Sequence, residues 1–400
     1  MTAFHFPKVH LGFIPLVDSA PFIIAEQKGF FANNGLDVEL HKEVSWANIR
    51  DRTIHGHFHA AQMLGPMPIA ASLGLGHLKV DLIAPMALGL GGNAVTVSSD
   101  LLATMRAVEP GLKPGDPINA GRALATCIAD RKQQGGDHLV FAVVYPFSAH
   151  NYELRYWLAA SGIRPDHDVR FIAVPPSQMV AALKDGHIDG FCVGEPWSSL
   201  AAQENVGQAI ISKSTIWPGC LEKVLGMCAD WAEAHPEIVD ALIVSLDAAC
   251  AWCEVPKNCN ELASILSSPK FVGTSTQAIL RSLTGKVVEE GVVCETAFMS
   301  FHGDAANMPW RGQGLWLYSQ MVRWGHVAHS SQGLKVAKAV YRPDIYARAL
   351  GDISPTLAKV RALEKTNFFS GKLYDGCSFD PTEVEKYLRS LEVSAYSARG

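Results

Sequence analysis

Two segments of the chain, each at the start of an expected helix, have the chemistry of an anion site. His150 follows an apolar run, Leu139–Val144, and Pro176 follows a second run, Val169–Val174. The first N–H groups of a helix are unpaired and its dipole is positive there, so an anion is favoured. In a parallel sheet both helix starts lie beyond the carboxyl ends of the strands. His150 is therefore the first candidate for a ligand contact.

Two other groups of residues have metal-ligating side chains. His55, His57 and His59 are expected on one face of a strand, and Cys250 and Cys253 lie one helical turn apart. The histidines have no carboxylate partner nearby in sequence, and the cysteines have no second pair. We therefore expect no metal and no cofactor. The motifs G-x-S-x-G and GK[ST] are missing, and no catalytic residue is assigned. An enzyme is not the expected class.

The elements that position these residues form two α/β units. Between His138 and Trp197, three apolar runs alternate with two segments of helical spacing, which is typical of parallel strands joined by crossover helices. The first eighty residues repeat this pattern. There we expect strands at Val9–Ile14, Val38–Leu40, Phe58–Met63 and Val80–Leu88, and helices after Asp18 and at Trp46–Ile54 and Pro66–Leu73.

The rest of the chain is expected to be mainly helical. Residues 98–135 are less regular, and their prolines and glycines indicate a loop before an alanine-rich helix, Asn119–Gln133. Pro236–Glu254 is the clearest helix after the chain returns near Ser212. A last amphipathic helix is expected at Thr382–Leu391. We predict a discontinuous first lobe, residues 1–94 plus 215–400, and a second lobe, residues 95–214.

Composition narrows the function. The chain has 400 residues, 48% of them hydrophobic, and a net charge of −5 without a long basic run, so direct nucleic-acid binding is not expected. No apolar run reaches the roughly 20 residues that span a bilayer. The start of the chain has no export signal, and the nine cysteines are an odd, scattered set. These features predict a cytoplasmic location.

Several segments resemble the nitrate- and bicarbonate-binding proteins of cyanobacterial ABC importers. They include Gly12–Pro21 (GFIPLVDSAP), Arg155–Ala160 (RYWLAA), Asp189–Trp197 (DGFCVGEPW) and Trp217–Val224 (WPGCLEKV). The resemblance implies a type II periplasmic-binding-protein fold, with two α/β lobes, two crossovers and a ligand cleft between them. Carried over position by position, it implies ligand contacts from Trp46, Asn93, His150, Pro176 and Lys223.

The chemistry of these positions favours nitrate over bicarbonate. Nitrate is a monoanion that only accepts hydrogen bonds, and Lys223, His150, Trp46 and Asn93 offer positive charge and N–H donors. The bicarbonate-binding branch carries Glu where this chain has Lys223, which suits a calcium-bridged ligand. Asn93 stands where the nitrate proteins have Gln. Because it is one methylene shorter, its contact is expected to be longer, bridged by water or suited to nitrite.

The resemblance also implies a role. A cytoplasmic branch of the family, the NasS-type nitrate/nitrite sensors, partners a NasT-like RNA-binding antiterminator protein. Ligand binding that favours one lobe arrangement would release this partner and switch on nitrate assimilation genes. Two alternatives stay open. One is the substrate-binding component of a nitrate/nitrite, less readily bicarbonate, ABC importer. The other is an enzyme, because pyrimidine synthases of thiamine biosynthesis share the fold; their cysteine-rich iron motif is not found here.

Overall fold

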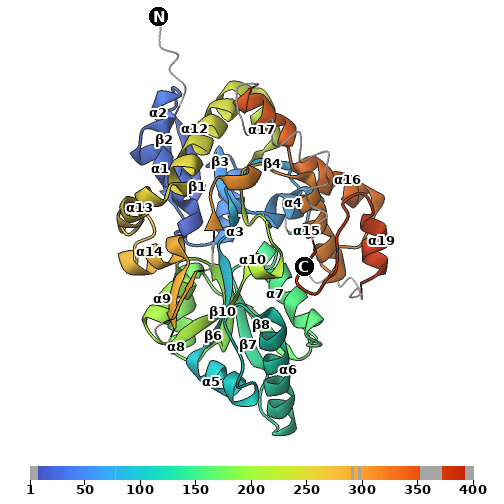
Figure 1. Cartoon of the computed structure of the whole chain (residues 1–400). Coiled ribbons are helices and arrows are strands. Elements are labelled where there is room, and N and C mark those ends of the chain that lie inside the picture. Colours follow the sequence, from blue (N-terminus) through green and yellow to red (C-terminus); the bar gives the residue numbers. More distant parts are fainter. Residues whose placement is uncertain (1–7, 77, 290–291, 296–298, 352–371, 392–400) are drawn as a thin grey trace, which may run out of the picture.

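A computed structural model of the chain describes residues 8–76, 78–289, 292–295, 299–351 and 372–391. These residues contain two five-stranded sheets, each with helices packed around it (Figure 1). In each of these two sheets, one strand runs antiparallel to the other four. Among the described residues, no helix has both the length and the apolar composition needed to cross a bilayer.

The first sheet is built from the beginning of the chain and one later strand. Its order is β2 (Val38–Lys42), β1 (Val9–Phe13), β3 (Ala60–Leu64), β11 (Lys223–Cys228) and β4 (Leu82–Ala87). The antiparallel member is β11, whose first residue, Lys223, pairs with Leu64 of β3. All five residues of β3 are buried, because helices cover both faces of the sheet.

The second sheet is built from the middle of the chain. Its order is β10 (Gly207–Ser212), β6 (Asn93–Ser98), β9 (Gly190–Gly194), β7 (Leu139–Val143) and β8 (Val169–Ala173). The antiparallel member is β6, and its first residue, Asn93, pairs with Gly194 of β9. The chain therefore passes from the first sheet to the second between β4 and β6, and returns between β10 and β11.

Helices connect and cover the strands. In the first part of the chain they are η1 (Val17–Ser19), α1 (Ala20–Gln27), α2 (Phe30–Asn33), α3 (Trp46–Ile54) and α4 (Pro66–Leu73). Around the second sheet they are α5 (Ser99–Val108), α6 (Pro117–Gln133), α7 (Ala149–Ala160), η2 (Pro176–Gln178), α8 (Met179–Lys184), α9 (Trp197–Gln203) and α10 (Lys213–Ile216).

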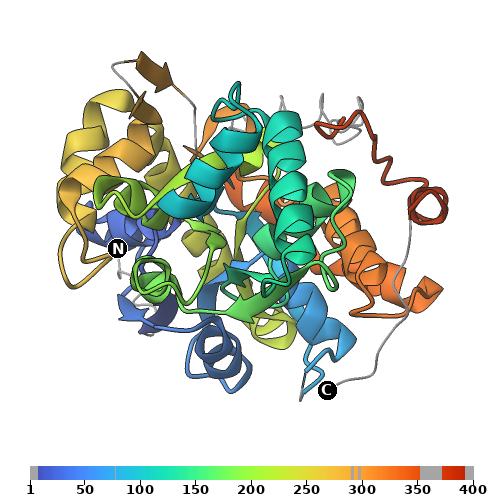
Figure 2. The same cartoon turned by 90° about the horizontal axis from the view of Figure 1, so that it is seen from below.

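The later part of the chain adds helices and short strands. These are α11 (Ala229–Ala234), α12 (Pro236–Glu254), η3 (Pro256–Asn258), α13 (Cys259–Leu266), α14 (Thr276–Thr284), η4 (Gly303–Ala305), α15 (Arg311–Arg323), α16 (Ser331–Val340), α17 (Pro343–Leu350) and α19 (Val384–Arg389), with β5 (Leu90–Gly91), β12 (Lys286–Glu289), β13 (Val292–Glu295) and β14 (Met299–Ser300). In both views α19 lies at the outer edge of the molecule, next to α15 (Figures 1 and 2).

Serine caps fix the two helices that carry expected site residues. The Ser45 hydroxyl accepts the N–H of Asn48 at 3.2 Å and starts α3, whose first residue is Trp46. The Ser148 hydroxyl accepts the N–H of Asn151 at 3.2 Å and starts α7, whose second residue is His150. Such caps pair N–H groups that a helix start leaves free. The expected start of α7 at Ser148 is confirmed.

Two expectations about local structure are wrong. Residues 99–108 form the helix α5 instead of a loop, because Ser98 caps it and Leu102 and Met105 bury one face. The triple-histidine segment lies outside any strand: α3 ends at Ile54, the chain turns at Gly56 with φ of +73°, and β3 starts only at Ala60. His55, His57 and His59 therefore do not share a strand face.

Candidate functional site

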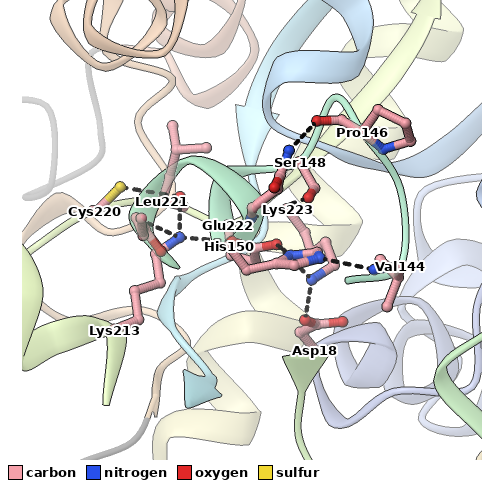
Figure 3. Close-up of polar contacts among 12 residues, drawn as sticks. Asp18, Val144, Pro146, Ser148, His150, Lys213, Cys220, Leu221, Glu222 and Lys223 are labelled. Carbon is pink, nitrogen blue, oxygen red and sulfur yellow. Dashed lines mark hydrogen bonds and ion pairs between the residues drawn. The ribbon is translucent and has the colours of Figure 1, made fainter. Parts of the chain in front are cut away.

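Lys223 belongs to a buried cluster of charged side chains (Figure 3). Its ammonium is 2.8 Å from Asp18 Oδ2 and 3.2 Å from Glu222 Oε1, and its side chain is only 2% exposed. Asp18 belongs to η1, just after β1, and Lys223 is the first residue of β11. This part of the cluster therefore comes from the first sheet and the loops that follow its strands.

Glu222 connects this pair to elements of the second sheet. Its Oε1 lies 2.9 Å from His150 Nδ1, and its Oε2 accepts from Lys213 Nζ at 2.6 Å. Lys213 also lies 3.1 Å from Glu153 Oε1 and donates to the carbonyl of Leu221 at 2.8 Å. His150 and Glu153 are on α7, and Lys213 begins α10. The cluster therefore joins the two halves of the molecule (Figure 3).

Burial and neighbouring charges shift the pKa values of the three carboxyl groups of the cluster in different directions. Burial raises the pKa of Asp18 and of Glu153, against the opposing pull of Lys223 and Lys213. Burial acts the same way on Glu222, but Lys213, Lys223 and His150 together hold its pKa well below its usual value. Glu222 is thus the firmly ionised carboxylate, whereas Asp18 and Glu153 are the groups that accept a proton more readily.

His150 uses both of its ring nitrogens within the protein. Burial lowers its pKa, so the imidazole is neutral and carries one N–H. Nδ1 faces the ionised Glu222, while Nε2 accepts the backbone N–H of Val144 at 3.4 Å. This pairing assigns the proton to Nδ1. In this arrangement no ring N–H of His150 is directed to a ligand, in contrast to the donor role expected from the sequence.

Trp46 and Asn93 have unpaired polar atoms. Within the described ranges, Trp46 Nε1 and both amide atoms of Asn93 are buried without a hydrogen-bond partner, and the two residues are 1% and 0% exposed. Lys223 Nζ lies 5.5 Å from the centre of the Trp46 ring. A Cβ on Gly194 would meet Asn93 Oδ1 at 3.1 Å and Asp18 Oδ2 at 3.2 Å, so Asn93 also borders the Asp18–Lys223 pair. Trp197 Nε1 and Trp316 Nε1 are also buried without a partner among the described residues, so it is their place beside the charged cluster that makes Trp46 and Asn93 candidates for a ligand or water.

Pro176 is less closely connected to the cluster. It is buried at the start of η2, beyond the carboxyl end of β8, as the sequence indicates. Within the described part of the chain, no hydrogen bond joins it to the charged cluster. A separate hollow, partly open to solvent, has Glu195, Ser198 and Arg281 in its lining. None of the expected site residues lines it.

Several residues of the cluster were not anticipated as site residues. Gln62 is fully buried on β3, donates to Asp18 Oδ1 at 2.5 Å and accepts the N–H of Ile14 at 2.9 Å. A glutamine inside the apolar run Ala60–Leu64 is the one sequence signal that was available. Glu153, Lys213 and Glu222 gave no such signal, because charged residues in a sequence usually lie on the surface.

Residues 4–267 match the model of the NMT1-like family. The chain belongs to the NMT1-like family. It is 33% identical over 406 residues to the nitrate/nitrite binding protein NrtA of Synechococcus elongatus, covering 98% of this chain and 87% of that protein. It is also 34% identical to the bicarbonate transport ATP-binding protein CmpC of the same species, over 96% of this chain. The chain spans about half the length of the ATP-binding relatives that it matches.

The solved structures agree with the fold of this NMT1-like chain. The crystal structure of the periplasmic nitrate-binding protein NrtA from Synechocystis PCC 6803 superposes with a TM-score of 0.87 at 28% identity, covering 96% of this chain and 98% of that one. The periplasmic-binding-protein fold expected from the sequence, with two α/β lobes, is confirmed. The chain thus has the fold of nitrate-binding substrate-binding proteins.

Proposed function

We propose that this chain binds nitrate, and also nitrite, beside Lys223. The observation that carries the proposal is a pair of buried N–H donors, Trp46 Nε1 and Asn93 Nδ2, that have no partner among the described residues. The Trp46 ring lies beside the Lys223 ammonium, and Asn93 lies near Asp18, the ion-pair partner of that lysine. A small planar anion that only accepts hydrogen bonds would pair these donors. Relatives of the chain that are named as nitrate-binding proteins support this ligand.

Asp18 is the group that must adjust when an anion enters. Its carboxylate already forms an ion pair with the Lys223 ammonium at 2.8 Å. Because burial raises the pKa of Asp18, a second negative charge nearby would favour its protonation. We therefore propose that nitrate joins Lys223 while Asp18 takes up a proton. The net charge of the cluster is then unchanged by binding, which avoids the cost of an uncompensated buried charge.

The other residues expected at the site contribute less directly to the proposed binding of nitrate. His150 holds Glu222, which in turn orients Lys223, and a direct contact with the ligand requires its ring to leave Glu222 or Val144. Pro176 would border the ligand from the second sheet. Asn93, shorter than glutamine, leaves room for a bridging water or for the different shape of nitrite.

The proposed ligand contacts come from both halves of the molecule. Trp46 and Lys223 belong to elements of the first sheet, and Asn93 begins a strand of the second. We propose the lobe boundaries 1–94 plus 215–400 and 95–214. The membership of the strands supports them to within two residues, because β6 of the second sheet already begins at Asn93. An anion held from both sides stabilises one arrangement of the lobes relative to others, by no more than its difference in affinity for them.

For the biological role we propose a cytoplasmic nitrate/nitrite sensor that releases a NasT-like RNA-binding antiterminator protein on ligand binding. The chain is then a binding protein without catalytic residues. The receptor of a nitrate/nitrite ABC importer is the second candidate, favoured by relatives named as transport components. Bicarbonate is the less favoured ligand, because Lys223 supplies directly the positive charge that a bridging calcium would bring.

A pull-down of the natural gene product from its own cells separates the two roles. A sensor should retain an RNA-binding partner in buffer without nitrate and lose it when nitrate is added. An importer receptor should instead be recovered from the periplasmic fraction, with no such partner. A partner that stays bound at every nitrate and nitrite concentration would contradict the sensor.

A calorimetric titration tests the ligand itself. Nitrate, nitrite and bicarbonate are each added with and without calcium, because the free Asn93 carbonyl oxygen is an acceptor that a bicarbonate hydroxyl could use. We expect binding of nitrate and nitrite that does not depend on calcium. Binding of bicarbonate alone, or only with calcium, would overturn the proposed ligand.

A further inference from the structure

Three polar side chains meet at the edge of the first sheet, away from the charged cluster. His10 is on β1, and Glu39 and His41 are on the neighbouring parallel strand β2. His10 pairs in register with Glu39, and Gly12 pairs with His41. Alternate residues of a strand point to the same face, so Glu39 and His41 both project beside His10. Strand pairing, rather than a sequence motif, brings the three together.

The ligand atoms of the three side chains lie close enough together to converge on one metal ion. His10 Nδ1 and His41 Nε2 are hydrogen-bonded at 2.9 Å, and a metal would take the place of the proton between them. Glu39 Oε2 lies 3.9 Å from the first nitrogen and Glu39 Oε1 lies 3.6 Å from the second. In a tetrahedral site with metal–ligand bonds of about 2.0–2.2 Å, neighbouring ligand atoms are about 3.3–3.5 Å apart. The three separations bracket this value. All three ligand atoms lie within 4.8 Å of one another.

The surroundings favour a divalent cation. An imidazole nitrogen that carries no proton presents a lone pair to a metal, and the Glu39 carboxylate supplies negative charge. The Lys8 ammonium, 2.9 Å from Glu39 Oε2, is an exposed cation that a metal can displace. The side chains of His10, Glu39 and His41 are 34%, 44% and 26% exposed, so solvent can enter and supply a fourth ligand.

A further histidine supports the orientation of the first. His59 Nδ1 accepts the backbone N–H of His10 at 2.9 Å, and the two rings stack with centres 5.6 Å apart. His59 is thus the member of the triple-histidine segment that contacts His10, and it packs against the His10 ring. His55 and His57 remain exposed in the turn before it.

We propose that His10, Glu39 and His41 form a binding site for a borderline divalent cation of the zinc type, with water completing the coordination. Two imidazoles and one carboxylate are a ligand set that zinc accepts in proteins. A bound ion would link β1 to β2, and β1 leads directly into η1, which carries Asp18. The site is distinct from the proposed nitrate site, and its test does not depend on nitrate binding.

The test uses the full chain with any polyhistidine tag removed and the metal stripped with a chelator. Zinc is titrated by calorimetry and by competition with a chromogenic chelator, and cobalt is added separately to read its visible absorption in a histidine site. We expect one equivalent to bind. His10→Ala and His41→Ala should each weaken zinc binding by at least about 100-fold, since even residues that only support metal ligands cost about 10–100-fold.

His57→Ala is the matched control, because this histidine is exposed on a nearby turn and lies outside the triad. It should bind zinc and cobalt like the unaltered chain. Thermal unfolding of each metal-free variant checks that it is folded, and a variant that is not folded is replaced by Glu39→Gln, which should also weaken zinc binding. No binding to the unaltered chain at micromolar zinc, or equal losses in the control and in the triad variants, would overturn the proposal.

Discussion

The two sides of the buried cluster differ in how completely their polar atoms are paired. On one side, Glu222, His150 and Lys213 are joined by short contacts, with Val144 and Leu221 supplying backbone partners. Within the part of the chain that the structure describes, Glu153 on this side makes no hydrogen bond but forms an ion pair with Lys213 at 3.1 Å. On the other side, the polar atoms of Trp46 and Asn93 are equally buried and have no hydrogen-bond partner among the described residues. Hydrogen bonds and ion pairs between buried groups stabilise a fold, whereas buried donors without any partner cost free energy until a ligand or water pairs with them.

This difference separates a structural role from a binding role within one site. Burial and charge alone do not distinguish the two sides, because both contain a lysine that is almost completely buried. What distinguishes them is the state of the hydrogen bonds. We therefore expect substitutions on the paired side to change stability, and substitutions on the unpaired side to change nitrate affinity.

The largest effect is expected on the paired side, from Lys213→Met. This change leaves the Glu222 and Glu153 carboxylates buried without their main cation. The free energy of unfolding, measured by denaturant titration, should fall by about 3–5 kcal/mol. Lys184→Met, at a lysine that is 63% exposed, is the control and should change it by less than about 0.5 kcal/mol. A loss as small as that of the control would contradict the structural role.

The second effect is expected from Lys223→Met, on the binding side. Removal of the ammonium should weaken nitrate binding by about 2–5 kcal/mol, because the anion loses its charged partner in a desolvated site. The stability should fall less than in Lys213→Met, since Asp18 can become protonated when its lysine is gone. Calorimetry with nitrate gives the affinity. Nitrate binding of unaltered strength in this variant would show that the site lies elsewhere.

Two buried asparagines give a matched pair for a smaller effect. Asn93 is unpaired, whereas Asn151 donates to the Pro146 carbonyl at 2.7 Å and accepts from Arg155 at 3.1 Å. Asn93→Ala should weaken nitrate binding by about 1.5–3 kcal/mol with little loss of stability. Asn151→Ala should lower stability by about 1–3 kcal/mol and leave affinity nearly unchanged. The reverse pattern would refute the distinction between the two sides.

The smallest effect is a pH dependence of nitrate affinity. Burial raises the pKa of Asp18, and a bound anion would raise that pKa further, so the complex holds more protons than the free protein. Affinity should therefore rise as the pH falls through the pKa of Asp18 in the complex, by at most about 1.4 kcal/mol per pH unit. Asp18→Asn should remove this slope. Titrations in buffers of different ionisation enthalpy measure the proton uptake, and its absence would argue against the proposed exchange.

The sequence predicted the local elements better than the cluster. The helices Trp46–Ile54, Pro66–Leu73 and Pro236–Glu254 have the predicted bounds, because apolar periodicity and initial prolines or a serine cap are local signals. Helix α5 was missed although Ser98 caps it, because the prolines that follow the helix made the whole segment resemble a loop. Glu222 and Lys213 could not be recognised as buried, since their burial depends on contacts with α7.

The central claim is that an anion fills the unpaired side of the cluster, and a crystal structure of the protein with nitrate tests it most directly. We predict a planar anion within hydrogen-bond distance of Trp46 Nε1, Asn93 Nδ2 and Lys223 Nζ, with the Glu222–His150–Lys213 contacts unchanged. An anion bound elsewhere, with Trp46 Nε1 and Asn93 Nδ2 still unpaired, would contradict the account.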